Sequence, residues 1–168
     1  MLGSDPTLLV IEDARLDAML IRVAARRAVP GLDVRVAGDG REGIAYLEGL
    51  PPFQDRRSHP FPDLVILDLL MPEVDGFGVL EWLRDRKGVR HVAVVVLTAS
   101  VDPAHEGRSR ELGATEFHKK PGDPEGLARV VRGIVEGYLS GGAEAREFGA
   151  MGHDGRPARP KPPATDRR

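Results

Sequence analysis

The sequence predicts an α/β protein built on a doubly wound, five-stranded parallel sheet. Five short apolar runs with the composition of buried strands alternate with segments whose apolar residues recur at helical spacing. This alternation indicates a parallel sheet with helices on both faces. Four of the five runs also end in charged or hydroxyl-bearing residues. Such residues are expected at the carboxyl edge of an open α/β sheet, where ligands bind.

Composition limits the classes of protein that need to be considered. The chain has 168 residues, of which 41% are hydrophobic and 30% charged, values typical of one globular domain. The net charge of −2 gives no indication of nucleic-acid binding. The chain contains no cysteine, which excludes disulfides, thiolate zinc sites and a cysteine nucleophile. With neither a signal peptide nor a membrane-spanning run, we expect a cytoplasmic protein that does not bind membranes.

The first half of the chain is predicted to contain two strand–helix pairs. Residues 7–11 form a buried strand that ends at Glu12-Asp13. The helix that follows is expected to face the core through Leu16, Met19, Leu20, Val23 and Ala24. Residues 32–36 alternate between apolar and polar residues, as in an edge strand. A second helix follows, and we expect it to face the core through Ile44, Leu47 and Leu50. Prolines in residues 50–62 exclude a regular element there.

The second half is predicted to contain three strand–helix pairs. Residues 63–67 form a buried strand that ends at Asp68, and a helix starts near Gly76. Residues 92–97 form the most β-prone run, and a helix with a thin apolar stripe starts near residues 102–103. Residues 114–118 form a short strand before the last helix, whose apolar positions are Leu127, Val130, Val131, Ile134, Val135 and Tyr138.

The chain ends are expected to lie outside the domain. Residues 1–6 are short and polar, and we expect them to be flexible. Residues 7–140 form the domain. Residues 141–168 are rich in glycine, proline and charge, and we expect them to be disordered because they can bury little apolar surface.

The predicted sheet brings the polar strand ends together. Taken alone, Asp68 is more simply explained as the cap of a turn or helix. In a parallel sheet, however, all strands end at the same edge, so Asp68 should lie near Glu12, Asp13, Thr98 and Lys120. It is much less plausible that all of them serve only as caps or surface residues at matching positions.

The chemistry of these residue types indicates a phosphoryl site. Clustered carboxylates repel one another unless a cation joins them. Oxygen ligands without nearby histidine or cysteine favour Mg²⁺. Lysine and threonine can bind phosphoryl oxygens, and an aspartate carboxylate is a competent phosphoryl nucleophile. The residues therefore predict a Mg²⁺-dependent phosphoryl site with Asp68 as the acceptor.

The same motifs resemble the receiver domain of two-component response regulators. The resemblance rests on Ile11-Glu12-Asp13, Leu67-Asp68 through Asp75-Gly76, Leu97-Thr98-Ala99 and Phe117 through Pro121, in this order. It implies a flavodoxin-like (βα)5 fold with strand order 2-1-3-4-5. The long proline-rich connection before Asp68 and the lack of an output domain resemble the single-domain regulators that are paired with bacterial phytochrome histidine kinases.

The resemblance implies a role for each residue of the site. Asp68 accepts the phosphoryl group from a phosphohistidine of a sensor kinase. Mg²⁺ is bound directly by the carboxylates of Asp13 and Asp68, directly or through water by Glu12, and by the backbone carbonyl of Leu70. The residues that bind the phosphoryl group are Thr98, Ala99 and Lys120. Lys119, next to the aligned lysine, is expected to be solvated.

The resemblance also implies a conformational switch at Thr98 and Phe117. When Thr98 moves to the phosphoryl group, the ring of Phe117 moves inward and remodels the face formed by the fourth helix, the fifth strand and the fifth helix. The simpler alternative is that Phe117 is only a core aromatic residue. The peptide bond before Pro121 is often cis in this family, which would turn Lys120 inward.

The expected partner is a sensor histidine kinase, and the family analogy adds a homodimer through the fifth strand and fifth helix. No direct contact with nucleic acid is expected, and no enzymatic activity beyond self-phosphorylation and autodephosphorylation.

Three alternatives to a phosphorylated receiver remain. A flavin or nucleotide binder would need a glycine-rich turn where the chain has Glu12-Asp13-Ala14. A phosphatase of the dehalogenase type would need a second acid at the position of Leu70. A receiver-like interaction module that does not use phosphate would be expected to have lost an acid or the lysine, and here both are kept.

Overall fold

The computed structural model describes residues 5–87 and 91–140. Five parallel strands form one sheet in the order β2-β1-β3-β4-β5. The strands are β1 (Thr7–Ile11), β2 (Asp33–Ala37), β3 (Leu64–Leu67), β4 (Ala93–Thr98) and β5 (Glu116–Lys119). The helices that alternate with them are α1 (Arg15–Ala28), α2 (Gly40–Glu48), α3 (Gly76–Asp85), α4 (Ala104–Glu111) and α5 (Pro124–Leu139). The predicted fold class and strand order are confirmed.

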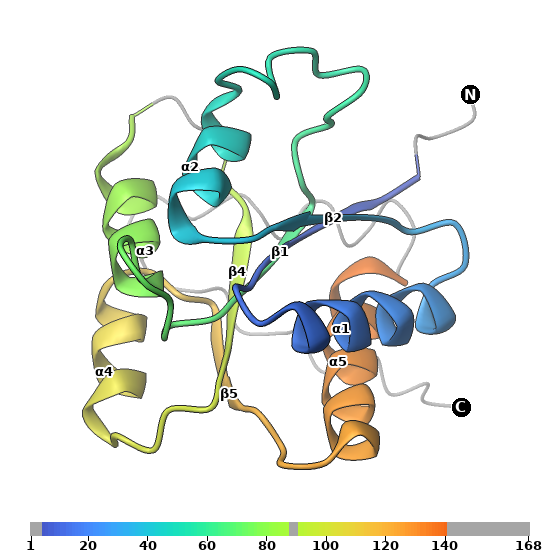
Figure 1. Ribbon diagram of the computed structural model, residues 1–168, viewed down its shortest axis with the longest axis vertical. Helices are drawn as coiled ribbons and strands as arrows, with labels where there is room; N and C mark the ends of the chain where they lie inside the picture. Colours follow the sequence, from blue (N-terminus) through green and yellow to red (C-terminus); the bar gives the residue numbers. More distant parts are fainter. Residues whose placement is uncertain (1–4, 88–90, 141–168) are drawn as a thin grey trace, which may run out of the picture.

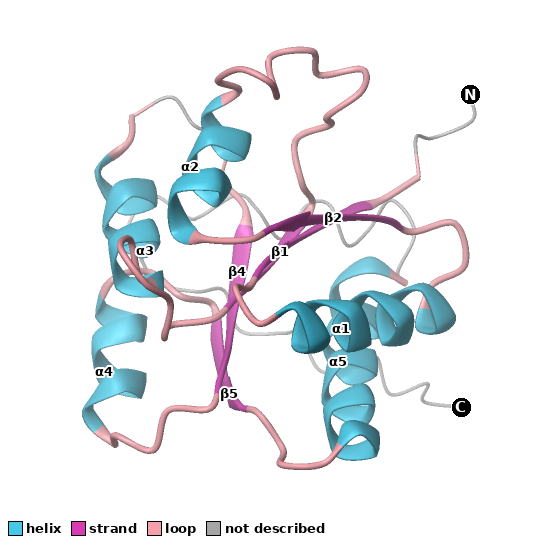
Figure 2. Ribbon diagram, in the orientation of Figure 1, coloured by secondary structure: helices cyan, strands magenta, loops and turns pink. Residues whose placement is uncertain are grey.

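Helices cover both faces of the sheet, as Figures 1 and 2 show. Helices α1 and α5 pack against each other on one face, and α2, α3 and α4 lie on the other. Side chains alternate along each central strand between these two faces. Leu8 and Val10 of β1 therefore enter the core under α1 and α5, while Leu9 and Ile11 enter the core under α2 and α3. This double burial explains why β1 and β3 are continuous apolar runs.

Aspartates set the starting points of three helices. The side chains of Asp39, Asp75 and Asp123 accept hydrogen bonds from the backbone N–H groups three residues further on. These N–H groups have no partner within the helix, so a cap of this kind contributes about 1 kcal/mol. The caps help to fix where each chain segment turns after leaving the carboxyl edge of the sheet.

The predicted inner face of α1 is confirmed for Ala24, which is buried, and for Leu20, which packs partly buried against the core, but it is wrong for the other three residues. Leu16, Met19 and Val23 are 63%, 47% and 41% exposed. The residues buried under this helix are Ala18, Ile21, Ala24 and Ala25. Helix α1 carries two apolar stripes, and the stripe with small side chains allows a close approach to the sheet and to α5. Ile21 and, in part, Leu20 are buried with this stripe, whereas Leu16, Met19 and Val23 are exposed to solvent.

The segment between α2 and β3 contains no helix or strand, as predicted, but it is anchored to α2. The guanidinium of Arg56 donates to the carbonyl oxygens of Tyr46 and Leu47, at 2.8 Å each, at the carboxyl end of the helix. The Tyr46 hydroxyl donates to the carbonyl oxygen of Pro60. Leu50, predicted to face inward, is instead exposed because α2 already ends at Glu48.

The predictions for the chain ends stay untested. Residues 1–4 and the expected disordered tail, residues 141–168, lie outside the described part of the chain. In residues 5–87 and 91–140, no helix combines the length and apolar character needed to cross a membrane.

Candidate functional site

The polar strand ends meet at the carboxyl edge of the sheet. Backbone hydrogen bonds continue the parallel pairing just past the strands. The N–H of Asp68 donates to the carbonyl of Ile11 at 3.0 Å, and the N–H of Lys120 donates to the carbonyl of Thr98 at 2.7 Å. The residues that follow each strand are therefore held in register, and Asp68 sits at the end of the central strand, β3.

Three carboxylates form the acidic centre of this edge. One carboxylate oxygen from each of Glu12, Asp13 and Asp68 lies within 4.8 Å of the other two. Glu12 and Asp68 are buried, whereas Asp13 is exposed. The cluster thus has a buried floor and an open side from which a cation or a phosphoryl group could enter.

Lys120 supplies the positive charge of the site. Its ammonium Nζ lies 2.6 Å from Oε2 of Glu12, 2.9 Å from Oδ2 of Asp17 and 3.5 Å from Oδ2 of Asp68. Burial by itself would lower the pKa of Lys120, but the hydrogen bonds to Glu12 and Asp17 and the charge of Asp68 outweigh it and raise the pKa. The lysine is therefore a permanent cation, whereas Lys119 beside it is exposed, as predicted.

Within residues 5–87 and 91–140, carboxylates outnumber ammonium groups at this edge. Lys120 contacts the carboxylates of Glu12, Asp17 and Asp68, and Asp13 adds a fourth carboxylate beside Glu12 and Asp68. Burial raises the pKa of the Glu12 carboxyl to about 7; the hydrogen bond from Lys120 lowers it, and the charge of Asp68 adds to the rise. Hard oxygen donors with an excess of negative charge fit a Mg²⁺ ion.

The β4 end brings a hydroxyl to the same edge. Thr98 is buried, and its Oγ1 accepts a hydrogen bond of 3.3 Å from the N–H of Ser100. The hydroxyl of Ser100 lies 2.6 Å from Nδ1 of His105 in the first turn of α4. Ala99, between them, is exposed. The loop that carries Thr98 is thus connected to α4 through hydrogen bonds.

Phe117 lies away from this edge, in the middle of β5. Its ring is partly buried against the core under α3 and α4. On the opposite side of the strand, Glu116 accepts hydrogen bonds from the Tyr138 hydroxyl at 2.7 Å and is 2.7 Å from Nε2 of His118. Strand β5 is therefore connected to α5 through Glu116 and Tyr138.

Two predicted details concern the backbone. The expected cis bond before Pro121 is wrong, because the cis peptide bond in the described residues precedes Pro52. Trans is the ordinary state of such a bond, and Lys120 turns inward without the isomerisation. Leu70 exposes its side chain, and its N–H lies 3.4 Å from Oδ1 of Asp68.

Asp17 belongs to the site but is absent from the predicted set. It lies on α1, four residues after Asp13 and so about one helical turn further on, and its carboxylate reaches Lys120. An acidic residue one turn after the strand-end pair was the available signal. Strand-end reasoning alone could not find it, because Asp17 lies within a helix.

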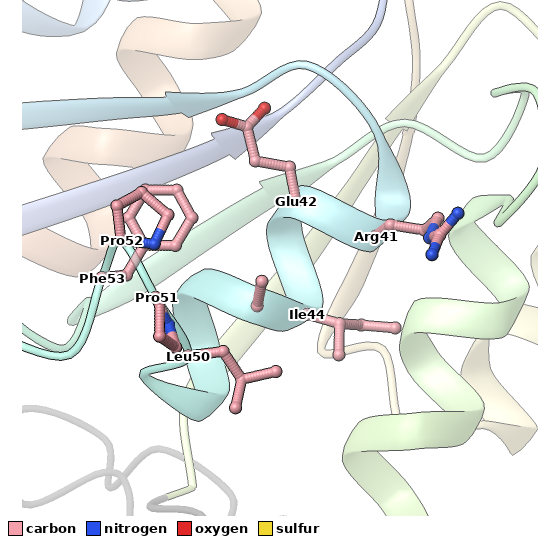
Figure 3. A pocket seen from close by; sticks show the side chains of 8 residues that line it. Arg41, Glu42, Ile44, Leu50, Pro51, Pro52 and Phe53 are labelled. Atoms are coloured by element: carbon pink, nitrogen blue, oxygen red, sulfur yellow. The ribbon is translucent and has the colours of Figure 1, made fainter.

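A hollow of about 500 Å³ lies elsewhere, along α2 and the loop after it (Figure 3). It is lined by Arg41, Glu42, Ile44, Ala45, Leu50, Pro51, Pro52 and Phe53. None of these residues belongs to the acidic edge. The hollow is therefore separate from the acidic edge.

Comparison with known families gives one match that covers most of the chain. A family model described as the response regulator receiver domain matches residues 8–132. Among curated proteins, the polar-differentiation response regulator DivK of Brucella ovis is 31% identical over 115 residues, which are 68% of this chain and 84% of that protein. The probable transcriptional regulator ycf27 of Porphyridium aerugineum is 34% identical over 129 residues, which are 76% of this chain but 47% of that protein. The chain thus spans about half the length of that relative.

Two solved structures show the same fold over nearly their whole length. The phosphorylated cyanobacterial phytochrome response regulator RcpA has a TM-score of 0.75 at 29% identity, covering 81% of this chain and 95% of that chain. The response regulator RPA3017, from red light signaling in R. palustris, has a TM-score of 0.72 at 31% identity, covering 80% of this chain and 94% of that chain.

Proposed function

The chain belongs to the family of response regulator receiver domains, as its motifs predict, and we propose that Asp68 accepts a phosphoryl group from a sensor histidine kinase. One observation carries the proposal. The carboxylate of Asp68 lies at the end of the central strand, beside two further carboxylates and 3.5 Å from the ammonium of Lys120. This is the arrangement that a phosphoryl acceptor needs.

The proposed reaction is the transfer of a phosphoryl group between two side chains. A carboxylate oxygen of Asp68 attacks the phosphorus of a phosphohistidine, and the P–N bond breaks with its electron pair going to the imidazole ring. The product is an aspartyl phosphate, which water hydrolyses to phosphate and Asp68. Lys120 and the hydroxyl of Thr98 bind the oxygens of the phosphoryl group, together with the backbone at Ala99.

The carboxylates of Glu12, Asp13 and Asp68 and the backbone carbonyl of Leu70 are proposed to hold Mg²⁺. The excess of carboxylates over ammonium groups at this edge supports the assignment. When bound, the ion would neutralise charge on the phosphoryl oxygens. Asp13, which is exposed, lies on the side from which the ion would enter.

The kinase is proposed to be a phytochrome histidine kinase that docks on α1. RcpA is named as a phytochrome response regulator and RPA3017 is named for red light signaling, which supports a phytochrome kinase as the partner. The exposed stripe of Leu16, Met19 and Val23 supports docking on α1. It begins three residues after Asp13, and its residues have the spacing that allows contact with a helix of a partner. The exposed arginines beside it, Arg15, Arg22 and Arg26, favour a partner with an acidic rim.

Signal output is proposed to pass through the α4-β5-α5 face. The hydrogen bond that the Ser100 N–H donates to Thr98 Oγ1, and the hydrogen bond between the Ser100 hydroxyl and His105 Nδ1, would transmit a movement of Thr98 to α4. The thin contact of α4 supports this, since Ser109 is its buried residue. Three further features stay predictions within this proposal: an inward movement of Phe117, a homodimer through β5 and α5, and a cytoplasmic location.

Labelling with a small phosphodonor tests the acceptor. Acetyl phosphate with Mg²⁺ should add one phosphoryl group to Asp68, measured by intact-protein and peptide mass spectrometry. Asp68→Asn should abolish the label because an amide cannot form the acyl phosphate. Asp85→Asn, which changes an exposed aspartate on α3, should label like the unaltered chain. A label that survives in Asp68→Asn would refute Asp68 as the acceptor, because another residue would then carry the phosphoryl group. If the unaltered chain took up no label, a phosphate-independent interaction module would be favoured.

A further inference from the structure

The ammonium of Lys120 forms close contacts with the carboxylates of Glu12 and Asp17 and a longer contact with the carboxylate of Asp68. The Lys120 side chain is only 8% exposed, and an ammonium has three N–H donors. Two of these donors form short hydrogen bonds, 2.6 Å to Glu12 and 2.9 Å to Asp17. The distance to the acceptor, Asp68, is 3.5 Å, which is longer than a well-formed hydrogen bond.

Asp17 differs from the other partners of Lys120 in its position. Glu12 and Asp68 follow strands, whereas Asp17 lies in the first turn of α1. Its side chain is 33% exposed, so solvent can hydrate it if the lysine leaves. Glu12 is buried, and its other carboxylate oxygen already accepts the N–H of Ala14 at 3.0 Å. Asp17 is therefore the partner that Lys120 can give up at the lower cost.

We propose that Asp17 is a positioning residue that holds Lys120 away from Asp68 until a phosphoryl group arrives. This inference rests on the proposed function, since it assumes that Asp68 is the acceptor. In the unphosphorylated protein, Asp17 draws the ammonium toward α1. When phosphoryl oxygens appear on Asp68, they compete with Asp17 for the same donor. The strength of the Asp17–Lys120 pair thus sets how favourable the phosphorylated state is.

Asp17 also couples the site to α1. The same helix exposes the apolar stripe of Leu16, Met19 and Val23. A protein bound to this stripe would lie beside Asp17 and could alter its contact with Lys120. The pair therefore offers a route by which docking on α1 could change the readiness of Asp68 to receive a phosphoryl group.

Binding of beryllofluoride, a phosphoryl analogue, tests the role of Asp17. With Mg²⁺ present, Asp17→Asn and Asp17→Ala should each lower the dissociation constant of beryllofluoride by about threefold to fivefold, the size that one partly exposed ion pair supports. Tryptophan fluorescence or calorimetry measures the binding. Glu125→Gln, which removes an exposed carboxylate from the first turn of α5, should leave the constant unchanged. An unchanged constant in both Asp17 variants, with a normal thermal unfolding transition, overturns the proposal.

A second experiment, in a chain that also carries Lys120→Met, distinguishes positioning of Lys120 by Asp17 from simple charge repulsion between Asp17 and the phosphoryl analogue. In Lys120→Met, the substitution Asp17→Asn should no longer improve binding, because there is no ammonium left to release. A gain of the same size in this background would mean that Asp17 acts only by its charge, and the positioning role would be wrong. If the unaltered chain bound no beryllofluoride, the proposed function itself would fail. If beryllofluoride binding required Asp68 but had the same dissociation constant in the Asp17 variants, only the inference about Asp17 would be wrong.

Discussion

At the scale of single residues, the acceptor depends on a glycine that carries no chemistry. A Cβ built on Gly76 would lie 2.3 Å from the carbonyl oxygen of Asp68 and 2.7 Å from the Cα of Leu69. The N–H of Gly76 donates to the carbonyl of Leu69 at 3.0 Å, which closes the loop between β3 and α3. The start of α3 therefore lies directly against the backbone of the acceptor, and only a residue without a side chain fits.

We predict that Gly76→Ala displaces this loop. It should lower the free energy of unfolding by about 1–3 kcal/mol, because the clash is with backbone atoms that cannot rotate away. It should also slow labelling of Asp68 by acetyl phosphate. Chemical denaturation and mass spectrometry measure the two effects.

The matched control is Gly133→Ala in α5, where a Cβ meets nothing within 4 Å. This change should raise stability by about 0.5–1 kcal/mol through helix propensity. If Gly76→Ala had the same free energy of unfolding and the same labelling rate as the unaltered chain, the close approach at Gly76 would contribute neither to stability nor to labelling.

At the scale of elements, α1 serves both the core and the surface. Its inner stripe, with Ala18, Ile21, Ala24 and Ala25, packs against the core, whereas its outer stripe of large apolar side chains is exposed to solvent. Exposing Leu16, Met19 and Val23 in one row is unfavourable unless a partner covers them. Helix α4 differs, because Ser109 is its buried residue. Its contacts include the hydrogen bonds that join Thr98, Ser100 and His105, and the exposed ion pair of Arg108 with Glu81 on α3. An element held in this way can shift at low cost.

We predict that Leu16→Ala and Met19→Ala impair transfer from the kinase but not labelling by acetyl phosphate. Each truncation removes contact area from the proposed docking stripe. Transfer from a phosphorylated phytochrome histidine kinase of the same organism should therefore slow by about fivefold to tenfold. Radiolabel transfer measures the rate. Leu50→Ala removes an equally exposed apolar side chain after α2 and should have no effect. Equal losses with acetyl phosphate would place the defect in the site and not in docking.

At the scale of the whole molecule, the sheet order assembles the site. Strands β1, β3, β4 and β5 are neighbours, so their carboxyl ends place Glu12, Asp68, Thr98 and Lys120 side by side. These residues are far apart in the chain: Glu12 and Lys120 are separated by 108 positions. The site therefore exists only in the folded state, and any ion that needs the whole cluster stabilises the fold.

We predict that Mg²⁺ raises the free energy of unfolding by about 2.7 kcal/mol at a hundredfold excess over its dissociation constant. Thermal or urea unfolding with and without the ion measures the change, and chelation should reverse it. Asp13→Ala should lose most of the effect, because it removes the exposed carboxylate of the cluster. If Asp13→Ala kept the whole shift, the ion would bind elsewhere.

The sequence by itself determined the sheet and most of its site. The apolar runs are confirmed as strands within one or two residues, because burial on both faces leaves a continuous local signal. The convergence of Asp68, Glu12, Thr98 and Lys120 also follows from sequence, since parallel connectivity puts every strand end at the same edge.

Only the tertiary structure decided how the helices meet that edge. Periodicity predicted one apolar stripe on α1, but a second stripe also satisfies the helical period, and only packing against the sheet and α5 selects the one that contains Ala18, Ile21 and Ala25. The contact between Asp17 and Lys120 depends on the same placement, because it joins a helix to the end of a strand 103 residues away. Local sequence carries no information on the position of one element relative to another. For this reason the position of Asp68 beside Glu12, Thr98 and Lys120 was predictable, and the contact of Asp17 with Lys120 was not.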